Sequence, residues 1–271
     1  LMEKVKAKKK FGQNFLKDDT VLSRIIQSMP NNNNHIVEIG PGLGDLTKNL
    51  VKCKDVTAYE VDTDLFTILK TKFAIPIENG SLTLVHTDVL ETWDRQKSLH
   101  SSKYDLIANL PYYIATNIIL RAFEDEACEH IIVMVQKEVA EKFSANEGKK
   151  EFSALGVISK LCSVESKILF DVPPESFDPA PKVISSILYI KKDMSKRIDK
   201  NFNSFLKACF QQPRKKLSKN ISSIVSKDTI AALFEELEIS DNIRPHELSS
   251  SLYSQIYTKA IINGREQDIT E

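Results

Sequence analysis

The 271-residue sequence predicts an α/β fold, a mostly parallel seven-stranded sheet with helices on both faces, followed by a small all-helical domain. Two observations predict this fold. Between residues 35 and 190, short β-branched runs alternate with longer amphipathic stretches, which is typical of βαβ units. After Lys191, apolar residues recur at spacings of three and four, and no strand candidate follows. We therefore expect two domains, residues 1–190 and 191–271.

Seven short runs are the expected strands, because each is rich in β-branched residues and bounded by turn residues: 35–40, 55–60, 82–86, 104–109, 130–135, 164–170 and 184–190. Helices are expected between them at 44–51, 63–73, 116–125 and 139–143, the last continuing after Glu151. The last two strands are joined by a proline-rich loop without room for a helix, so we expect them to pair antiparallel. The second domain should contain helices at 197–211, 226–237 and 246–260.

The composition excludes several classes of protein. The longest apolar runs fall short of 18 residues, so no transmembrane helix and no contact with a membrane are expected. The basic N-terminus is not followed by an apolar segment, so it does not read as a secretory signal. The four cysteines are scattered, without a C-x-x-C pair or a nearby histidine, which argues against zinc and disulfides. We expect inert thiols in a reducing cytoplasm and no bound metal.

The net charge of zero hides an uneven distribution of charge along the chain. Residues 1–18 carry a net charge of +4 and residues 191–220 a net charge of +8, whereas residues 19–190 carry −7 and residues 221–271 carry −5. Basic segments on both sides of an acidic middle indicate a polyanion that is held at the flanks. The alternative is that these lysines are merely solvated.

A glycine-rich turn follows the first expected strand, in the segment Glu38-Ile39-Gly40-Pro41-Gly42-Leu43-Gly44. Glycines at a strand-to-helix turn let a ligand approach the backbone, at the edge where open α/β sheets bind ligands. A dinucleotide site would need G-x-G-x-x-G, but here the third glycine comes one residue early. The pattern resembles the cofactor loop of Rossmann-like class I methyltransferases, which bind S-adenosylmethionine.

Acidic residues end the next two expected strands. Glu60, about twenty residues beyond the first glycine, can accept hydrogen bonds from both hydroxyls of a ribose. Asp62 is the competing candidate, although its position just before a helix favours a capping role. The third strand is followed by Thr87-Asp88-Val89-Leu90, where the Asp88 carboxylate can accept from an adenine amine. Three successive strand ends with glycine or acceptor groups indicate a binding site.

The tetrad Asn109-Leu110-Pro111-Tyr112 ends the fourth strand and predicts methylation of an amine on a planar base. Adenine N6 is a poor nucleophile, because its lone pair is delocalised into the ring. The side-chain oxygen of Asn109 and a nearby backbone carbonyl, aimed by Pro111, can accept the two N–H hydrogens. Tyr112 offers a face on which the extruded base can stack. No strong general base is required, because the methylated ammonium loses its proton to water.

Together these motifs resemble the KsgA-type family of small-subunit ribosomal RNA adenine N6,N6-dimethyltransferases, over about residues 9–248. The family's N-terminal motif matches residues 12–16, its fifth-strand motif residues 136–140, its base-flanking loop residues 174–183 with Phe177, and its basic C-terminal turn residues 210–216. Pro213 stands where a basic residue is expected, and could begin the next helix. The resemblance implies that the cofactor contacts are Gln13, Asn14, Leu16, Gly40, Gly42, Glu60, Asp88, Val89 and Asn109, and that the catalytic residues are Asn109, Leu110, Pro111, Tyr112 and Phe177.

The resemblance further implies the substrate and the partners. The family transfers four methyl groups to two adjacent adenosines in a hairpin near the 3′ end of small-subunit rRNA, during ribosome assembly. We expect a cytoplasmic monomer with a catalytic domain at 1–190 and an RNA- and ribosome-binding domain at 191–271. The expected phosphate contacts are Lys8, Lys9, Lys10, Arg214, Lys215, Lys216 and Lys219.

Three alternatives compete with this interpretation. The first is a macrolide-resistance type of rRNA adenine methyltransferase, which acts on the large subunit and shares the N-terminal and N-x-P-Y motifs. Leu43 and the long proline-rich loop favour the small-subunit type. The second is a non-catalytic RNA-binding assembly factor, which should have lost cofactor positions that are intact here. The third, a Rossmann dehydrogenase, is disfavoured by the early third glycine.

Overall fold

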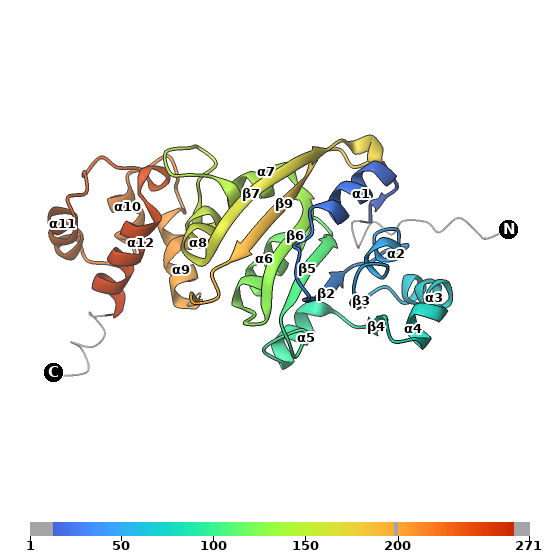
Figure 1. Cartoon of the computed structure of the whole chain (residues 1–271). Helices are drawn as coiled ribbons and strands as arrows, with labels where there is room; N and C mark the ends of the chain where they lie inside the picture. Colours follow the sequence, from blue (N-terminus) through green and yellow to red (C-terminus); the bar gives the residue numbers. More distant parts are fainter. Residues whose placement is uncertain (1–12, 198–199, 263–271) are drawn as a thin grey trace. The chain divides into compact units, whose positions relative to one another are not determined.

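A computed structural model describes residues 13–197 and 200–262 of the chain (Figure 1). These residues form two compact units. The first contains the described chain up to Ala140 together with Val164–Met194, and the second contains Glu141–Ser163 together with the described chain from Ser195 onward. The predicted α/β fold with a helical C-terminal part is confirmed.

The first unit is built on a seven-stranded sheet with the order β4-β3-β2-β5-β6-β9-β7 (Figure 1). Strands β2 to β6 run parallel to one another, and β9 runs antiparallel to β6. All seven predicted strands are present within two residues of their expected ends, and the last two lie side by side. The strands are β2 (His35–Ile39), β3 (Val56–Glu60), β4 (Leu82–His86), β5 (Tyr104–Asn109), β6 (Cys128–Gln136), β7 (Ser163–Val172) and β9 (Ser185–Lys192).

The burial of the strands explains why they could be predicted from the sequence. The central strands β2, β3 and β5 are buried along nearly their whole length, as expected for parallel strands covered on both faces, and they read as continuous apolar runs. Strand β4 lies at the edge of the sheet and is largely half-exposed. The sheet therefore positions its carboxyl edge rigidly, because its middle strands cannot shift without opening the core.

The helices of the first unit follow the strands, with α3 against β3 and β4, and α6 against β6. Their ends are marked by capping residues, such as Asp18 before α1 and Asp62 before α3. Helix α1 was not predicted, although its buried face of Val21, Leu22 and Ile25 has helical spacing. The helices are α1 (Asp19–Gln27), α2 (Thr47–Leu50), α3 (Thr63–Lys72), α4 (Ala74–Glu78), α5 (Val89–Arg95), α6 (Ala115–Glu124) and α7 (Lys137–Ser144), which crosses the division between the units.

A second, two-stranded sheet was also absent from the prediction. Strand β1 (Phe15–Leu16) pairs antiparallel with β8 (Phe177–Asp178), which follows the short helix η2 (Pro174–Ser176). The backbone N–H of Lys17 donates to the Ser176 carbonyl at 2.9 Å and extends this pairing. Two residues per strand give no periodic signal, so only long-range contacts reveal the element. The pairing ties the N-terminal segment to the first unit.

The second unit is helical, with α8 (Ala154–Cys162), α9 (Lys200–Cys209), α10 (Leu217–Ile221), α11 (Lys227–Glu236), η3 (Pro245–Glu247), α12 (Ser250–Tyr257) and a π-helical turn at Thr258–Ile262. Its core contains aromatic pairs such as Phe210 and Tyr253, whose ring centroids lie 5.4 Å apart. The predicted division at residue 190 differs from these units in two places, because the first unit extends to Met194 and does not include Glu141–Ser163. Helix α8 groups with the C-terminal helices because its apolar residues pack against α9 and α12.

The turn between α9 and α10 carries the predicted basic cluster. Pro213 lies within this turn and does not begin the next helix, which starts at Leu217. The turn is closed by the side chain of Asn220, which accepts from the Gln212 N–H at 2.7 Å and donates back to the Gln212 carbonyl. The four basic side chains of the cluster are exposed: Arg214, Lys215, Lys216 and Lys219.

Candidate active site

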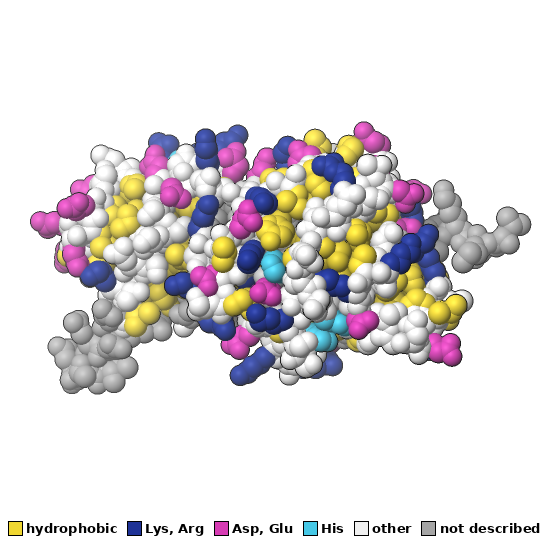
Figure 2. Space-filling model, viewed as in Figure 1, with side chains coloured by type: hydrophobic (Ala, Val, Ile, Leu, Met, Phe, Trp, Pro, Cys, Tyr) yellow, Lys and Arg dark blue, Asp and Glu magenta, His cyan; other side chains and the backbone are white. Residues whose placement is uncertain are grey.

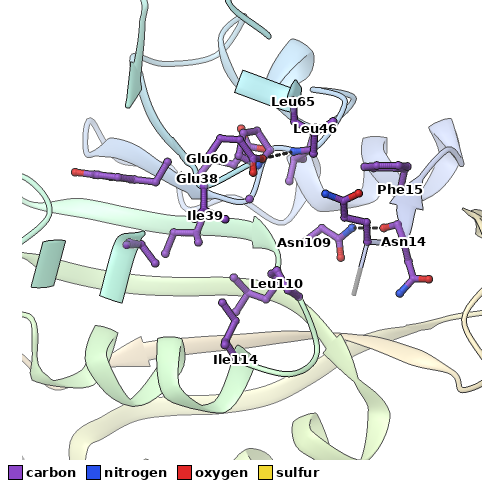
Figure 3. Close-up of a pocket in the computed structure, with 18 of the residues that line it drawn as sticks. Asn14, Phe15, Glu38, Ile39, Leu46, Glu60, Leu65, Asn109, Leu110 and Ile114 are labelled. Atoms are coloured by element: carbon purple, nitrogen blue, oxygen red, sulfur yellow. Dashed lines mark hydrogen bonds between the residues drawn. The ribbon is translucent and has the colours of Figure 1, made fainter. Parts of the chain in front are cut away.

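A cavity opens at the carboxyl edge of the parallel strands, within the first unit (Figure 3). It is lined by residues that are far apart in the sequence, from the N-terminal segment and from the ends of β2, β3, β4 and β5. The fold brings almost all of the predicted cofactor-binding and catalytic residues to this cavity: Gln13, Asn14, Leu16, Gly40, Gly42, Glu60, Asp88, Val89, Asn109, Leu110, Pro111 and Tyr112.

The glycine-rich turn forms the floor of the cavity. Gly40, Gly42 and Gly44 all have positive φ angles, of 66°, 61° and 80°, which side chains rarely tolerate. Gly44 is also required for packing, because a Cβ atom there would lie 2.4 Å from the ring of Phe73. Gly42 faces the cavity, where an added Cβ would press on the Phe15 ring at 3.1 Å. The backbone therefore lies open to a ligand.

Glu60 connects this turn to the end of β3. One carboxylate oxygen accepts from the backbone N–H of Gly42 at 3.3 Å, and the other accepts from that of Asp62 at 2.9 Å. Burial raises the pKa of Glu60, and these hydrogen bonds act in the opposite direction. Each oxygen keeps further lone pairs that can accept from a ligand.

The competing candidate Asp62 has the predicted capping role. Its Oδ1 accepts from the N–H groups of Asp64 and Leu65 at the start of α3. Its Oδ2 accepts from the side-chain amide of Gln13 at 3.1 Å. Asp62 thus holds both a helix and the N-terminal wall of the cavity in place.

Asp88 both caps a helix and lines the cavity. Its Oδ1 accepts from the N–H of Leu90 at 2.8 Å and caps α5. Among the described residues, no donor reaches Oδ2. Because Asp88 lines the cavity and is only half-buried, this second oxygen can accept from a ligand.

The Asn109 side chain is oriented by the N-terminal segment. Its Nδ2 donates to the backbone carbonyl of Asn14 at 3.1 Å, so Oδ1 points away from this contact, as Figure 3 shows. No described residue donates to Oδ1. The Pro111 carbonyl accepts from the N–H of Ile114, whereas the Leu110 carbonyl accepts no hydrogen bond from the described chain. The structure therefore presents two acceptors in succession, Asn109 Oδ1 and the Leu110 carbonyl.

The two tyrosines that follow differ in their surroundings. Tyr112 is half-buried, and its hydroxyl lies 2.6 Å from Oγ of Ser185. Tyr113 lines the same cavity but is 58% exposed. Burial raises the pKa of Tyr113, and the nearby charges of Asp88 and Glu60 raise it further. Tyr113 was not a predicted site residue, and its place directly after the tetrad is the only signal in the sequence.

In the sequence, Glu38 stands out only as the acidic residue before the glycine turn. It is buried in the floor of the cavity, and Thr47 Oγ1 donates to its Oε2 at 2.6 Å. Desolvation, together with the nearby charge of Glu60, raises the pKa of Glu38 to about 8. Near neutral pH this carboxyl group is therefore largely protonated.

Two groups of predicted site residues are not brought to the cavity. Phe177 pairs with Leu16 in the β1–β8 ladder and is buried in the hydrophobic core, but unlike Leu16 it does not line the cavity. The basic cluster of Arg214, Lys215, Lys216 and Lys219 belongs to the second unit. Lys8, Lys9 and Lys10 lie outside the described residues.

A cluster of possible metal ligands lies near the amino ends of β5 and β6, away from the cavity. Ligand atoms of Asp105, Glu129 and His130 lie within 4.8 Å of one another. The Asn34 side-chain amide donates to both carboxylates, at 3.0 and 2.7 Å, and His130 Nδ1 lies 2.8 Å from Asp105. These hydrogen bonds compensate the buried carboxylate without an ion, and they fasten the asparagine-rich loop to the sheet.

The charge of the cavity lining limits the class of ligand. Carboxylate groups come from Asp45, Glu60 and Asp88, while none of the described lining residues is Lys, Arg or His. The described lining therefore offers no cationic side chain that could pair with a pyrophosphate. A ligand with positive charge and hydroxyl or amine donors is favoured instead.

The sheet order, the glycine turn and the acidic strand ends together define a class I methyltransferase. The chain belongs to the ribosomal RNA adenine dimethylase family, whose model matches residues 4–261. It is a methyltransferase enzyme of the kind that the sequence resemblance predicted.

Several known proteins are similar to this chain over nearly its full length. Ribosomal RNA small subunit methyltransferase A of Aliarcobacter butzleri is 75% identical over 266 residues, which cover 98% of this chain and all of that protein. The protein of the same name from Sulfurimonas denitrificans is 52% identical over 96% of each chain. A dimethyladenosine transferase from Plasmodium falciparum has the same fold, with a TM-score of 0.76, 22% identity, and coverage of 90% of this chain and 96% of that one.

Proposed function

We propose that this enzyme transfers methyl groups from S-adenosylmethionine to the N6 amines of two adjacent adenosines, in a hairpin near the 3′ end of small-subunit rRNA, during ribosome assembly. The observation that carries the proposal is the pair of acceptors at Asn109 and Leu110, presented in an acidic cavity whose described lining contains no basic residue. The names of the similar proteins support the choice of the small subunit.

The residues of the cavity fit S-adenosylmethionine. Glu60 would accept from the ribose hydroxyls, and Asp88 Oδ2 would accept from the adenine amine. Val61 and Val89 supply apolar surface for the adenine faces. When bound, S-adenosylmethionine supplies a methyl group on a positively charged sulfur, from which an in-line nucleophile can take it.

The chain's own residues act on the nucleophile. The N6 hydrogens of the target adenine would be accepted by Asn109 Oδ1 and by the Leu110 carbonyl, which pulls the nitrogen toward tetrahedral geometry. Tyr112 would stack on the extruded base and hold it in line for the transfer. Pro111 restricts the backbone directly after both acceptors. The proton that leaves the product goes to water, so no side chain is needed as a strong base.

The remaining partners follow from the substrate. RNA is favoured over DNA, because an unpaired loop base is the accessible target in RNA and the cluster of Arg214, Lys215, Lys216 and Lys219 can contact phosphates. Residues 1–190 would then form the catalytic part, and residues 191–271 the RNA- and ribosome-binding part, of a cytoplasmic monomer. No helix among the described residues is long and apolar enough to cross a bilayer.

The proposal is tested by methyl transfer from labelled S-adenosylmethionine to two substrates, immature small ribosomal subunits and naked large-subunit rRNA. Mass-spectrometric mapping should find dimethylated adenosines in a hairpin near the 3′ end of the small-subunit rRNA. Transfer to the large-subunit RNA alone would refute the choice of substrate. Failure of the wild-type protein to bind the cofactor, measured by calorimetry, would support an assembly factor without catalytic activity.

A further inference from the structure

A buried serine lies against the tyrosine of the tetrad. Tyr112 Oη and Ser185 Oγ are 2.6 Å apart, although the two residues are separated by 73 positions in the sequence. We infer that Ser185 is a positioning residue, which holds the ring of Tyr112 in the orientation on which the target base stacks. The inference rests on the proposed function, because it concerns how Tyr112 acts on a base.

The hydrogen bond at the Tyr112 hydroxyl restricts the orientation of the ring. The ring has two side-chain torsions, and its backbone lies in the turn after Pro111, outside the strands and helices. A hydrogen bond to the hydroxyl, at the end of the ring opposite the backbone, restricts both torsions together. Because Tyr112 is half-buried and its hydroxyl is beside a buried partner, breaking this bond would leave a polar group without compensation. The bond is therefore expected to persist.

Ser185 itself is held by the sheet. It is the first residue of β9, is fully buried, and lies opposite Gln136 in the antiparallel pairing with β6. Since β6 runs parallel to β5, the start of β9 lies at the same edge of the sheet as the end of β5, where the tetrad begins. Three adjacent strands thus fix the distance between the serine and the tyrosine.

The next residue provides a matched control. Ser186 is also fully buried in β9, but successive side chains of a strand point to opposite faces. Its Oγ donates to Asp171 Oδ1 at 2.7 Å and has no bond to Tyr112. Ser185→Ala and Ser186→Ala therefore remove the same group, with the same burial, from the same strand. They differ in whether the tyrosine loses its partner.

The test measures kcat and KM for immature small subunits at saturating S-adenosylmethionine, and the Kd of the cofactor by calorimetry. Ser185→Ala and Tyr112→Phe should each lower kcat/KM about three- to tenfold, the range of a single lost hydrogen bond, with an unchanged cofactor Kd. The double variant should be no worse than either single variant. Ser186→Ala should transfer like the wild type, and Ser185→Thr, which keeps the hydroxyl, should retain most of the activity.

Three results would overturn the inference: wild-type transfer by Ser185→Ala, additive losses in the double variant, or a parallel rise in the cofactor Kd that indicates general loosening. If Ser185→Ala does not fold, Tyr112→Phe tests the same bond without altering β9. Absence of transfer by the wild-type protein would instead refute the proposed function, so the two failures are distinguishable.

Discussion

The side-chain amide of Asn109 donates a hydrogen bond to the backbone carbonyl of Asn14, 3.1 Å away and 95 positions earlier in the sequence. This hydrogen bond orients the Asn109 side chain. An amide group that donates with its nitrogen on one side presents its oxygen on the other, so the N-terminal segment sets the direction of Asn109 Oδ1, the acceptor that we propose for the target amine (Figure 3). The first prediction follows from this arrangement.

Replacing Asn109 by alanine should lower kcat about a hundredfold or more, because an acceptor that stabilises the developing charge is removed. Methyl transfer at saturating substrates is the measurement, and thermal unfolding should show an intact fold. Asn49→Ala is the matched control, since its amide also donates to a backbone carbonyl, that of Asp45 at 3.1 Å, but Asn49 does not line the cavity. Undiminished transfer by Asn109→Ala would refute the mechanism.

Replacing Glu60 by glutamine should act mainly on cofactor affinity. Glutamine has one acceptor oxygen where the carboxylate has two, so it cannot accept hydrogen bonds from Gly42, Asp62 and a ribose equally well. We expect the calorimetric Kd of S-adenosylmethionine to rise about ten- to a hundredfold, the range of a lost hydrogen bond to a charged group. The exposed Glu91→Gln on α5 serves as the control. A Kd that stays at the wild-type value would show that Glu60 only braces the glycine turn.

The raised pKa of Glu38 predicts that the stability of the protein depends on pH. Its folded-state pKa of about 8 lies above the ordinary value of 4.5, so the folded protein binds this proton more tightly than the unfolded chain does. The contribution of Glu38 to the free energy of unfolding is therefore fully present below pH 4.5 and is lost as the pH rises toward 8. Glu38→Gln, which keeps an acceptor for Thr47, should remove this loss and unfold at a higher temperature than the wild type near pH 8.

The difference between the two unfolding curves should shrink toward pH 5, and near pH 8 it should reach at most a few kcal/mol. Circular dichroism melts across this range measure it. The exposed Glu147→Gln should leave the pH profile of the wild type unchanged. Parallel profiles for wild type and Glu38→Gln would contradict the prediction.

Tyr113 should contribute to cofactor binding and not to base stacking. It lies at the cavity near Asp88 and Glu60, and more than half of its surface is exposed without a ligand. Tyr113→Ala should raise the cofactor Kd about three- to tenfold through lost apolar contact, while Tyr113→Phe should be nearly neutral. Ile75→Ala removes a comparably exposed apolar side chain on α4, away from the cavity, and should have no effect. A change confined to KM for the RNA would assign Tyr113 to the base instead.

The basic turn of the second unit should set the salt dependence of RNA binding. Replacing Arg214, Lys215, Lys216 and Lys219 together by alanine should weaken binding and reduce the slope of log K against log salt by roughly 0.7 to 0.9 per lost phosphate contact. Filter binding to small-subunit RNA at several salt concentrations measures this slope. Figure 2 shows acidic and basic side chains interspersed over the visible face. A single basic cluster can therefore determine the local affinity for RNA. Lys70→Ala, on the exposed side of α3, should leave the slope unchanged, and an unchanged slope in the fourfold variant would remove this turn from the RNA interface.

The strands of the sheet could be predicted because their burial leaves a local signal. Strands such as β2 and β5 are buried on both faces, so their residues read as short apolar runs without any knowledge of the rest of the chain. The ends of parallel strands meet at one edge, which is why Glu60, Asp88 and Asn109 could be expected to gather there. The β1–β8 ladder has two residues on each side and leaves no such signal.

By itself, the sequence determined the order of strands and helices and the chemical groups available at the strand ends, because periodicity and turn residues act locally. Only the tertiary structure decided how those groups are used. It left the Leu110 carbonyl without a donor among the described residues, placed Tyr112 against Ser185, divided Asp88 between a helix cap and the cavity, and buried Phe177 outside the cavity lining. Each of these outcomes depends on contacts between residues far apart in the chain, which have no periodic trace in the sequence.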